Sequence, residues 1–257
     1  MSAPAGPDAT RAGPTGPVAA GTADRGLRLP GIHGRRAVVT GAAGALGSAV
    51  AAQLRDAGAR VGGIVRPGSG RVPRDITGAS ADLTDEAAVG ACFAMLVQSL
   101  GGPPEIVVHC AGGYAGAPLA ETSLAQWRRM IEDNLTAAFL VVRAALPPMM
   151  AAGWGRIVTV GSRASLQGGE GSAAYSASKG GLLRLTESAA AEGLGRGVTV
   201  NCVLPGTIDT PSNRRAMPGA EPGSWVAPEA IAGVCLFLCS DAAAVISGAA
   251  VPVYGRS

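Results

Sequence analysis

Residues 37–47 read AVVTGAAGALG, a short β-branched run followed at once by a turn of glycines and alanines. The next residues, 46–57, have the apolar spacing of a helix. Small residues in such a turn let the backbone approach a ligand closely, and a helix N-terminus favours negative charge. The stretch therefore predicts an α/β unit with a candidate phosphate-binding turn. A tight turn without a ligand is the competing interpretation.

The same alternation of short strands and longer helices continues to the end of the chain. Further strands are expected at residues 60–65, 76–81 (weakly patterned), 105–109, 156–160, 198–203 and 249–253, and helices at 86–100, 124–150, 174–192 and 229–238. This order predicts a single doubly wound, Rossmann-type α/β domain, a parallel sheet with helices on both faces. Ligands of such folds bind beyond the carboxyl ends of the strands.

Composition sets the domain limits. The chain has 257 residues, of which 47% are hydrophobic, enough for one large core. Residues 1–33 are rich in proline, glycine and alanine and are predicted to be a disordered tail before a catalytic domain at 34–257. A transit peptide is the alternative interpretation of the tail. The tail is not predicted to be a signal peptide, because it lacks the apolar segment that a signal peptide needs. No run reaches the roughly 18 apolar residues of a membrane helix.

Charge and cysteine content exclude several classes of partner. The chain has 21 basic and 18 acidic residues, and the whole excess of +3 lies in residues 1–36. A neutral body argues against nucleic acid binding, which needs a basic surface. Five scattered cysteines and two histidines predict neither a metal site nor a disulfide framework, and they suit a reducing, cytoplasmic location.

The only lysine of the chain, Lys179, lies four residues after Tyr175 in a predicted helix. Residues at this spacing share one helix face. A phenol has a pKa near 10, and a neighbouring ammonium favours the phenolate and is expected to lower that pKa. Tyr175 could then exchange a proton with a carbonyl or carbinol oxygen.

These motifs together resemble the classical short-chain dehydrogenase/reductase family. The turn at 40–47 is similar to its T-G-x-x-x-G-x-G pattern, and Tyr175 and Lys179 match its Y-x-x-x-K pair. The resemblance covers about residues 34–255. It implies hydride transfer between a nicotinamide cofactor and a carbonyl or carbinol carbon. The implied catalytic residues are Asn134, Ser162, Tyr175 and Lys179, where Ser162 binds the substrate oxygen and Asn134 holds a water molecule that links Lys179 to solvent.

Two departures from the family pattern are visible. Ala45 stands where the turn has its middle glycine, which would matter if that position needed a positive φ. His109 and Cys110 replace the two asparagines of the family's N-N-A-G segment. This second change removes amides that brace the neighbouring backbone, so lower local stability is expected.

The cofactor residues follow from the same resemblance. No acidic residue ends the strand at 60–65, and Arg66 there can offer a guanidinium to a 2′-phosphate, so NADP (NADPH) is favoured over NAD. Asp82 is expected to contact adenine, and capping of the next helix is its alternative role. The implied cofactor-binding residues are Gly41, Ala43, Ala45, Leu46, Gly47, Arg66, Asp82, Leu83, Ala111, Gly112, Tyr175, Lys179, Pro205, Gly206, Ile208 and Thr210.

Loops are expected to choose the substrate, a small carbonyl compound or alcohol. Candidate contacts are Tyr114, Arg163, Gln167 and Trp225. Residues 211–225 lack periodicity and are predicted to form a mobile lid. The family also implies a homodimer or homotetramer.

Three alternative functions stay open at this point. A 3-oxoacyl-(acyl-carrier-protein) reductase would need a basic patch for its acidic carrier. Only Arg156 lies near the end of the long helix at 124–150, and Arg196, later in the chain, is compatible with such a patch. An epimerase, dehydratase or lyase of this fold is disfavoured by the intact Ser162, Tyr175 and Lys179. A nucleotide-sensing protein would be expected to have lost the tyrosine or the lysine.

Overall fold

The computed structural model describes residues 29–255. Its core is one seven-stranded sheet in which every pair of neighbouring strands is parallel, in the order β3-β2-β1-β4-β5-β6-β7. The strands are β1 (Arg36–Thr40), β2 (Arg60–Val65), β3 (Thr77–Ser80), β4 (Ile106–His109), β5 (Gly155–Val160), β6 (Val198–Pro205) and β7 (Ala250–Val253). The doubly wound fold is thereby confirmed.

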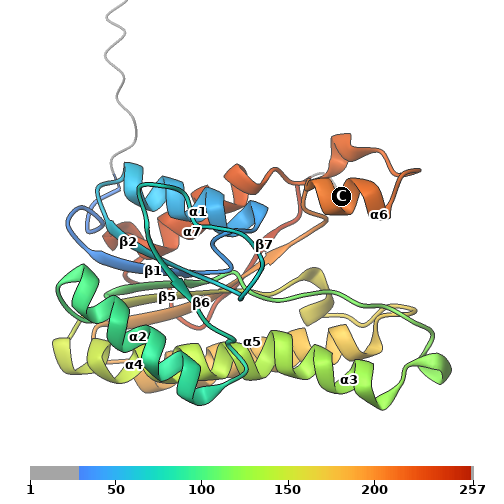
Figure 1. Cartoon of the computed structure of the whole chain (residues 1–257), viewed down its shortest axis with the longest axis horizontal. Helices are drawn as coiled ribbons and strands as arrows, with labels where there is room; N and C mark the ends of the chain where they lie inside the picture. Colours follow the sequence, from blue (N-terminus) through green and yellow to red (C-terminus); the bar gives the residue numbers. More distant parts are fainter. Residues whose placement is uncertain (1–28, 256–257) are drawn as a thin grey trace, which may run out of the picture.

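Helices cover both faces of this sheet. They are α1 (Ala45–Asp56), α2 (Glu86–Leu100), α3 (Leu124–Ile131), α4 (Ala137–Ala152), α5 (Ala173–Gly193), α6 (Pro211–Ala216) and α7 (Pro228–Cys239). Figure 1 shows α1 and α7 on one face and α2, α4 and α5 on the other. The helices on each face bury an apolar cluster of side chains against the strands, so the core forms one layer on each side of the β-sheet.

The helix expected at 124–150 is interrupted. A π-helical turn, Glu132–Thr136, separates α3 from α4. Inside it, the amide of Asn134 donates to the Gly113 carbonyl and its oxygen accepts from the Gly113 N–H, both at 3.0 Å. Such turns often occur at functional sites. This one sets Asn134 against the loop that follows β4, a long-range contact that the helical spacing does not encode.

The segment after β6 also differs from its prediction. Residues 211–225, expected as an irregular lid, begin with the short helix α6. Thr210 caps this helix by accepting a hydrogen bond from the Asn213 N–H at 3.1 Å, and Pro211 occupies the first helical position. A capping threonine and a proline at this position are a helix-start signal, but six residues are too few for a visible period.

The start of the described chain packs on the body. Ile32 is fully buried, and the Asp241 N–H donates to the Pro30 carbonyl at 2.9 Å. The end of the predicted tail, residues 29–33, is thus ordered here, and residues 1–28 lie outside the described part.

One helical stretch, Leu124–Ala152, is long and apolar enough to cross a membrane by composition alone. It includes the polar turn around Asn134, and 44% of its most apolar window is buried against the protein. A core helix of a soluble protein passes the same test, so this finding is weak evidence for a membrane span.

Candidate active site

The strand order reverses between β1 and β4, and a pocket of about 310 Å³ opens beyond their carboxyl ends. Its wall includes Gly41 and Ala43 of the glycine-rich turn and Ala111 and Gly112 after β4. Gly41 has φ +65°, and a Cβ there would lie 3.0 Å from the Ala111 nitrogen. The helix N-cap, Gly44, makes no side-chain cap. This narrow, uncapped helix start suits a pyrophosphate.

The two departures from the family pattern cause no backbone strain. Within residues 29–255, only glycines have positive φ, and Ala45 is the first residue of α1. The Thr40 hydroxyl accepts from the Ala111 N–H at 3.1 Å and lies 3.0 Å from Nδ1 of His109. Burial lowers the pKa of His109 to about 3, so the ring is neutral. Thr40 and His109 thus connect to this segment, while Nε2 of His109 is buried without a hydrogen-bond partner among the described residues. The lower local stability stays a prediction.

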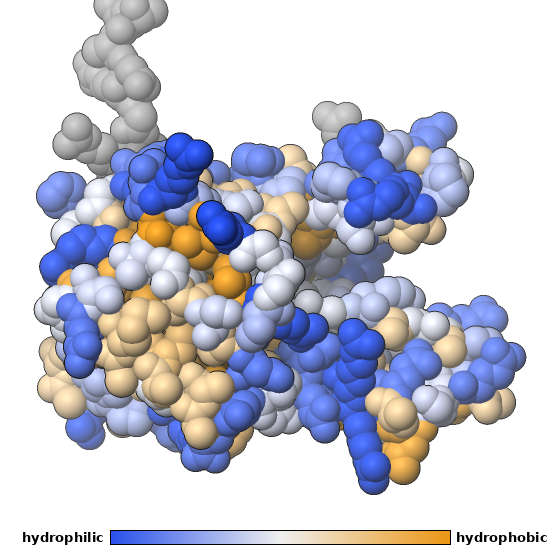
Figure 2. Space-filling view, viewed as in Figure 1, coloured by the Kyte–Doolittle hydropathy of each residue, from blue (hydrophilic) through white to orange (hydrophobic). Residues whose placement is uncertain are grey.

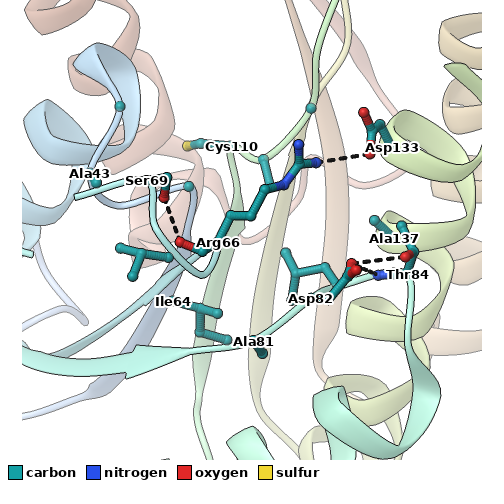
Figure 3. Close-up of a pocket in the computed structure, with 16 residues that line it drawn as sticks. Ala43, Ile64, Arg66, Ser69, Ala81, Asp82, Thr84, Cys110, Asp133 and Ala137 are labelled. Carbon is teal, nitrogen blue, oxygen red and sulfur yellow. Dashed lines mark hydrogen bonds and ion pairs between the residues drawn. The ribbon is translucent and has the colours of Figure 1, made fainter. Parts of the chain in front are cut away.

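Arg66 and two aspartates lie across the same pocket (Figure 3). Arg66 Nη2 is 2.8 Å from Oδ1 of Asp133. Asp82 accepts hydrogen bonds from the Thr84 N–H at 3.0 Å and hydroxyl at 2.8 Å, which lower its pKa, with a smaller contribution from Arg66. The N-cap of α2 is Asp85, so Asp82 does not have the alternative capping role.

The predicted catalytic residues converge on the next strand ends. Ser162 follows β5, and its hydroxyl accepts from the Ala164 N–H at 3.2 Å while hydrogen bonding to Tyr175 of α5. The ring of Tyr114 meets the ring of Tyr175 edge-on, with centroids 5.0 Å apart. The hydroxyls of Ser162 and Tyr175 therefore lie close together, and both residues line a second pocket.

Lys179 lies behind this pair. Its Nζ donates to the Val160 carbonyl at 2.8 Å and lies 6.0 Å from the Tyr175 ring centroid. The side chain is 5% exposed, and burial lowers the pKa of its ammonium to about 8. A Cβ on Gly112 would come within 2.6 Å of Asn134 Oδ1 and 3.3 Å of Lys179 Nζ. Glycine at 112 therefore lets Asn134 and Lys179 approach the same loop.

The expected lowering of the tyrosine pKa is not seen. Burial raises the pKa of Tyr175 above its ordinary value, Tyr114 adds to the rise, and only the hydrogen bond with Ser162 opposes it. The reason is geometric, because the ammonium of Lys179 is directed to the Val160 carbonyl. Tyr175 is therefore expected to keep its proton at neutral pH.

The second pocket, of about 610 Å³, lies beside these hydroxyls. Figure 2 shows the surface hollowed between the segment that carries α6 and the part that carries α3. Its lining includes Ser162, Tyr175, Pro205, Gly206 and Ile208, and the substrate candidates Tyr114, Arg163 and Gln167. The structure thus brings three of the four substrate candidates to the catalytic hydroxyls.

Some predicted residues lie elsewhere. Leu46 and Gly47 are buried behind the turn, Ala45 is exposed at the start of α1, and Thr210 caps α6. From the segment after β6, Asn213 and Met217 line the second pocket, and Trp225 is absent from its described lining. Sequence reasoning missed these two, and also Ser69, Thr84 and Asp133 in the first pocket. Only Asp133 had a visible signal, its position beside Asn134.

Among residues 29–255, no group of three or more histidine, cysteine or acidic side chains is placed to hold a metal ion. The cysteines in this range are all free thiols.

Comparison with known proteins decides the family. Residues 35–220 match the family model described as short chain dehydrogenase. The chain belongs to this family. It is accordingly an NAD(P)-dependent oxidoreductase acting on CH–OH or C=O groups, and the relatives it matches are named dehydrogenases.

Three relatives illustrate the range. A cis-4-hydroxycyclohexanecarboxylate dehydrogenase of Sinomonas cyclohexanicum is 38% identical over 86% of this chain and 95% of its own length. A 3-oxoacyl-[acyl-carrier-protein] reductase of Pseudomonas aeruginosa is 35% identical over 87% and 97%. A crystal structure of an NAD(P)-dependent gluconate 5-dehydrogenase from Beutenbergia cavernae, with NADP bound at low occupancy, is 34% identical over 87% and 96%, with a TM-score of 0.78.

Proposed function

We propose that this short-chain dehydrogenase is an NADPH-preferring ketoreductase that reduces a small ketone or aldehyde, or runs the reverse alcohol oxidation, with Tyr175 as the general acid or base. The observation that supports this most is the convergence of the Ser162 and Tyr175 hydroxyls on a pocket of about 610 Å³, with Lys179 buried behind them. The pocket is large enough for a small carbonyl compound beside a cofactor ring.

A bound nicotinamide cofactor would supply or accept the hydride at the carbonyl carbon. The chain's own residues act on the oxygen. Ser162 would donate a hydrogen bond to the carbonyl oxygen and hold it beside Tyr175. The protonated phenol of Tyr175 would then transfer its proton to that oxygen as negative charge develops. The ammonium of Lys179, directed to the Val160 carbonyl in this structure, would turn toward Tyr175 to stabilise the phenolate that remains.

The residues for the cofactor fit a dinucleotide. Gly41 and Gly112 leave room where any Cβ would crowd neighbouring atoms, and α1 begins without a side-chain cap. Arg66 at the end of β2 would pair with the 2′-phosphate of NADPH. The bound NADP in the gluconate 5-dehydrogenase neighbour is consistent with this preference.

The substrate would be held by the loops around the second pocket. We assign this role to Tyr114, Arg163 and Gln167, which line it, and retain Trp225 as a candidate for the closed lid. Asn213 and Met217 join them from the α6 segment.

A carrier-bound 3-oxoacyl substrate is the second candidate, since several relatives are named as such reductases. Of the two arginines considered for carrier recognition, Arg156 is buried and packs 4.3 Å from the Trp154 ring, whereas Arg196 is exposed. One exposed arginine of this pair is a weak basic patch for an acidic carrier, so the small substrate is preferred.

We also propose that the enzyme works in the cytoplasm as a homodimer or homotetramer. Helices α3 and α4 expose the apolar side chains of Leu124, Trp127 and Phe139. A second copy of the chain can cover this surface. Light scattering of the purified protein at micromolar concentration should give two or four times the 25.3 kDa chain mass. A monomer at that concentration would contradict this part.

The function is tested by following NADPH absorbance with a panel of small ketones, aldehydes and 3-oxoacyl thioesters. We expect turnover with members of the small-carbonyl group, and a loss of about 10²- to 10⁴-fold in kcat for Tyr175→Phe with cofactor binding retained. Turnover that survives in Tyr175→Phe, or that occurs only with carrier-bound thioesters, would contradict the proposal.

A further inference from the structure

The first pocket is bridged by an ion pair between two elements that are distant in the sequence. Arg66 leaves the end of β2 and reaches over the pocket to Asp133 in the π-helical turn, with Nη2 and Oδ1 2.8 Å apart (Figure 3). The arginine side chain is 56% exposed, whereas that of Asp133 is only 13% exposed. The guanidinium is therefore the movable partner, and the carboxylate is the fixed one.

Asp133 is fixed by its neighbour in the chain. Asn134 is locked to both backbone groups of Gly113, so the turn that carries Asp133 has no freedom to swing away. The other oxygen of Asp133 lies 3.5 Å from Nε of Arg129. This contact is longer than the 2.8 Å pair with Arg66, so it contributes less. Arg66 is therefore the principal counter-ion of Asp133.

The other acid in the pocket does not depend on Arg66 in this way. Asp82 is already satisfied by two hydrogen bonds from Thr84. The charged residues among the described lining are Arg66, Asp82 and Asp133. Two carboxylates and one guanidinium give the pocket a net negative charge, which opposes entry of a 2′-phosphate.

We propose that Asp133 is a specificity-determining residue that competes with the cofactor's 2′-phosphate for Arg66. This inference rests on the proposed NADPH site. A phosphate binds a guanidinium best through two parallel N–H groups, so Arg66 must release Asp133 or share itself between two anions. A cofactor without the 2′-phosphate leaves the pair intact. Asp133 therefore weakens NADPH binding and reduces the preference of the enzyme for NADPH over NADH.

The test measures Kd by calorimetry for NADPH and NADH, and for the fragments adenosine 2′,5′-bisphosphate and 5′-AMP, which probe this pocket without the nicotinamide end. In Asp133→Asn, the near-isosteric amide removes the competing charge. We expect NADPH and adenosine 2′,5′-bisphosphate to bind about 5- to 10-fold more tightly, with NADH and 5′-AMP changed less than about 2-fold. Asp133→Ser should repeat this selectivity without an amide at the site.

The matched control is Glu132→Gln. It removes the same charge one residue earlier in the turn, from an exposed side chain outside the described pocket lining. It should leave the ratio of the Kd for adenosine 2′,5′-bisphosphate to the Kd for 5′-AMP unchanged. An equal effect of Glu132→Gln and Asp133→Asn would overturn the proposal, because a general field effect would then explain both.

Arg66→Ala separates this inference from the proposed function. If Arg66→Ala weakens NADPH at least 10-fold while Asp133→Asn leaves NADPH unchanged or weakens it, competition is wrong and the NADPH site stands. In that case Asp133 would orient Arg66 for the phosphate. If Arg66→Ala leaves NADPH binding unchanged, the NADPH assignment itself fails. Selective tightening in Asp133→Asn, lost when Arg66→Ala is added, is the result that supports competition.

Discussion

The ammonium of Lys179 donates a hydrogen bond of 2.8 Å to the carbonyl of Val160, the last residue of β5. This contact places a buried positive charge behind Tyr175 without a carboxylate to neutralise it. Burial lowers the pKa of Lys179 to about 8. The lysine is thus close to losing its proton just above physiological pH, and we propose that its charge stabilises a phenolate at Tyr175 once the ammonium turns from the Val160 carbonyl toward it.

Reduction should therefore weaken in mildly alkaline solution. The ammonium is present below its pKa of about 8 and is lost as the pH rises through that value. We expect kcat/KM for carbonyl reduction to fall about tenfold per pH unit above this point. The measurement is the pH profile from 6 to 10 at saturating NADPH.

Lys179→Arg is the control for the predicted fall in kcat/KM above pH 8. A guanidinium stays charged throughout this range, so any residual activity should show no fall near pH 8. If kcat/KM of the variant fell in the same way above pH 8, the titrating group would not be Lys179.

A methyl group at Gly112 should disrupt the catalytic centre. Its Cβ would lie 2.6 Å from Asn134 Oδ1, and φ is +156°. We expect Gly112→Ala to lower kcat by at least about 10-fold and to destabilise the fold by about 1–3 kcal/mol, through backbone strain and displacement of Asn134. Steady-state kinetics and urea unfolding measure the two effects.

Gly90→Ala in α2 is the matched substitution, because its Cβ would meet nothing within 4 Å. An alanine in a helix interior should raise stability by up to about 1 kcal/mol and leave kcat unaltered. If both variants behaved alike, the steric argument for Gly112 would be wrong.

The buried thiols should make stability fall in alkaline solution. Burial raises the pKa of Cys235 to about 12, while an unfolded thiol ionises near 9. The folded state then holds a proton that the unfolded state has lost. Stability from this group is complete below pH 9 and decreases by about 1.4 kcal/mol per pH unit above it.

Cys235→Ala isolates that contribution. The free energy of unfolding, measured by urea titration at pH 8 and 10, should depend less steeply on pH in the variant, although its value at pH 8 is lower because a small cavity forms. Parallel pH dependences would show that Cys235 does not contribute.

Much of this architecture could be predicted from the sequence because its signals are local. The strand-turn-helix run at residues 37–56 and the spacing of Tyr175 and Lys179 depend on neighbours a few residues away. The central strands are continuous apolar runs, as expected for a parallel sheet buried on both faces. Ser162 was expected after the strand at 156–160 because the sequence resembles the family, and it follows β5.

The remaining features depend on contacts that sequence spacing does not encode. In the π-helical turn, Asn134 binds Gly113, 21 residues earlier. The pair of Arg66 and Asp133 spans 67 residues. The pKa of Tyr175 rises because burial outweighs a lysine that is directed elsewhere. Each of these lies at the site, where local rules are most often overridden by tertiary contacts.

The measurement that tests the central claim most directly is the fate of the cofactor's hydrogen. Purified enzyme is supplied with NADPH that carries deuterium at both hydrogen positions of C4 and with the best substrate of the carbonyl panel, and the product is analysed by mass spectrometry and NMR. The account predicts one deuterium on the carbinol carbon, none on the oxygen after exchange in water, and no labelled product from Tyr175→Phe within the same time. A product without deuterium at that carbon, or a product formed without any cofactor turnover, would contradict it.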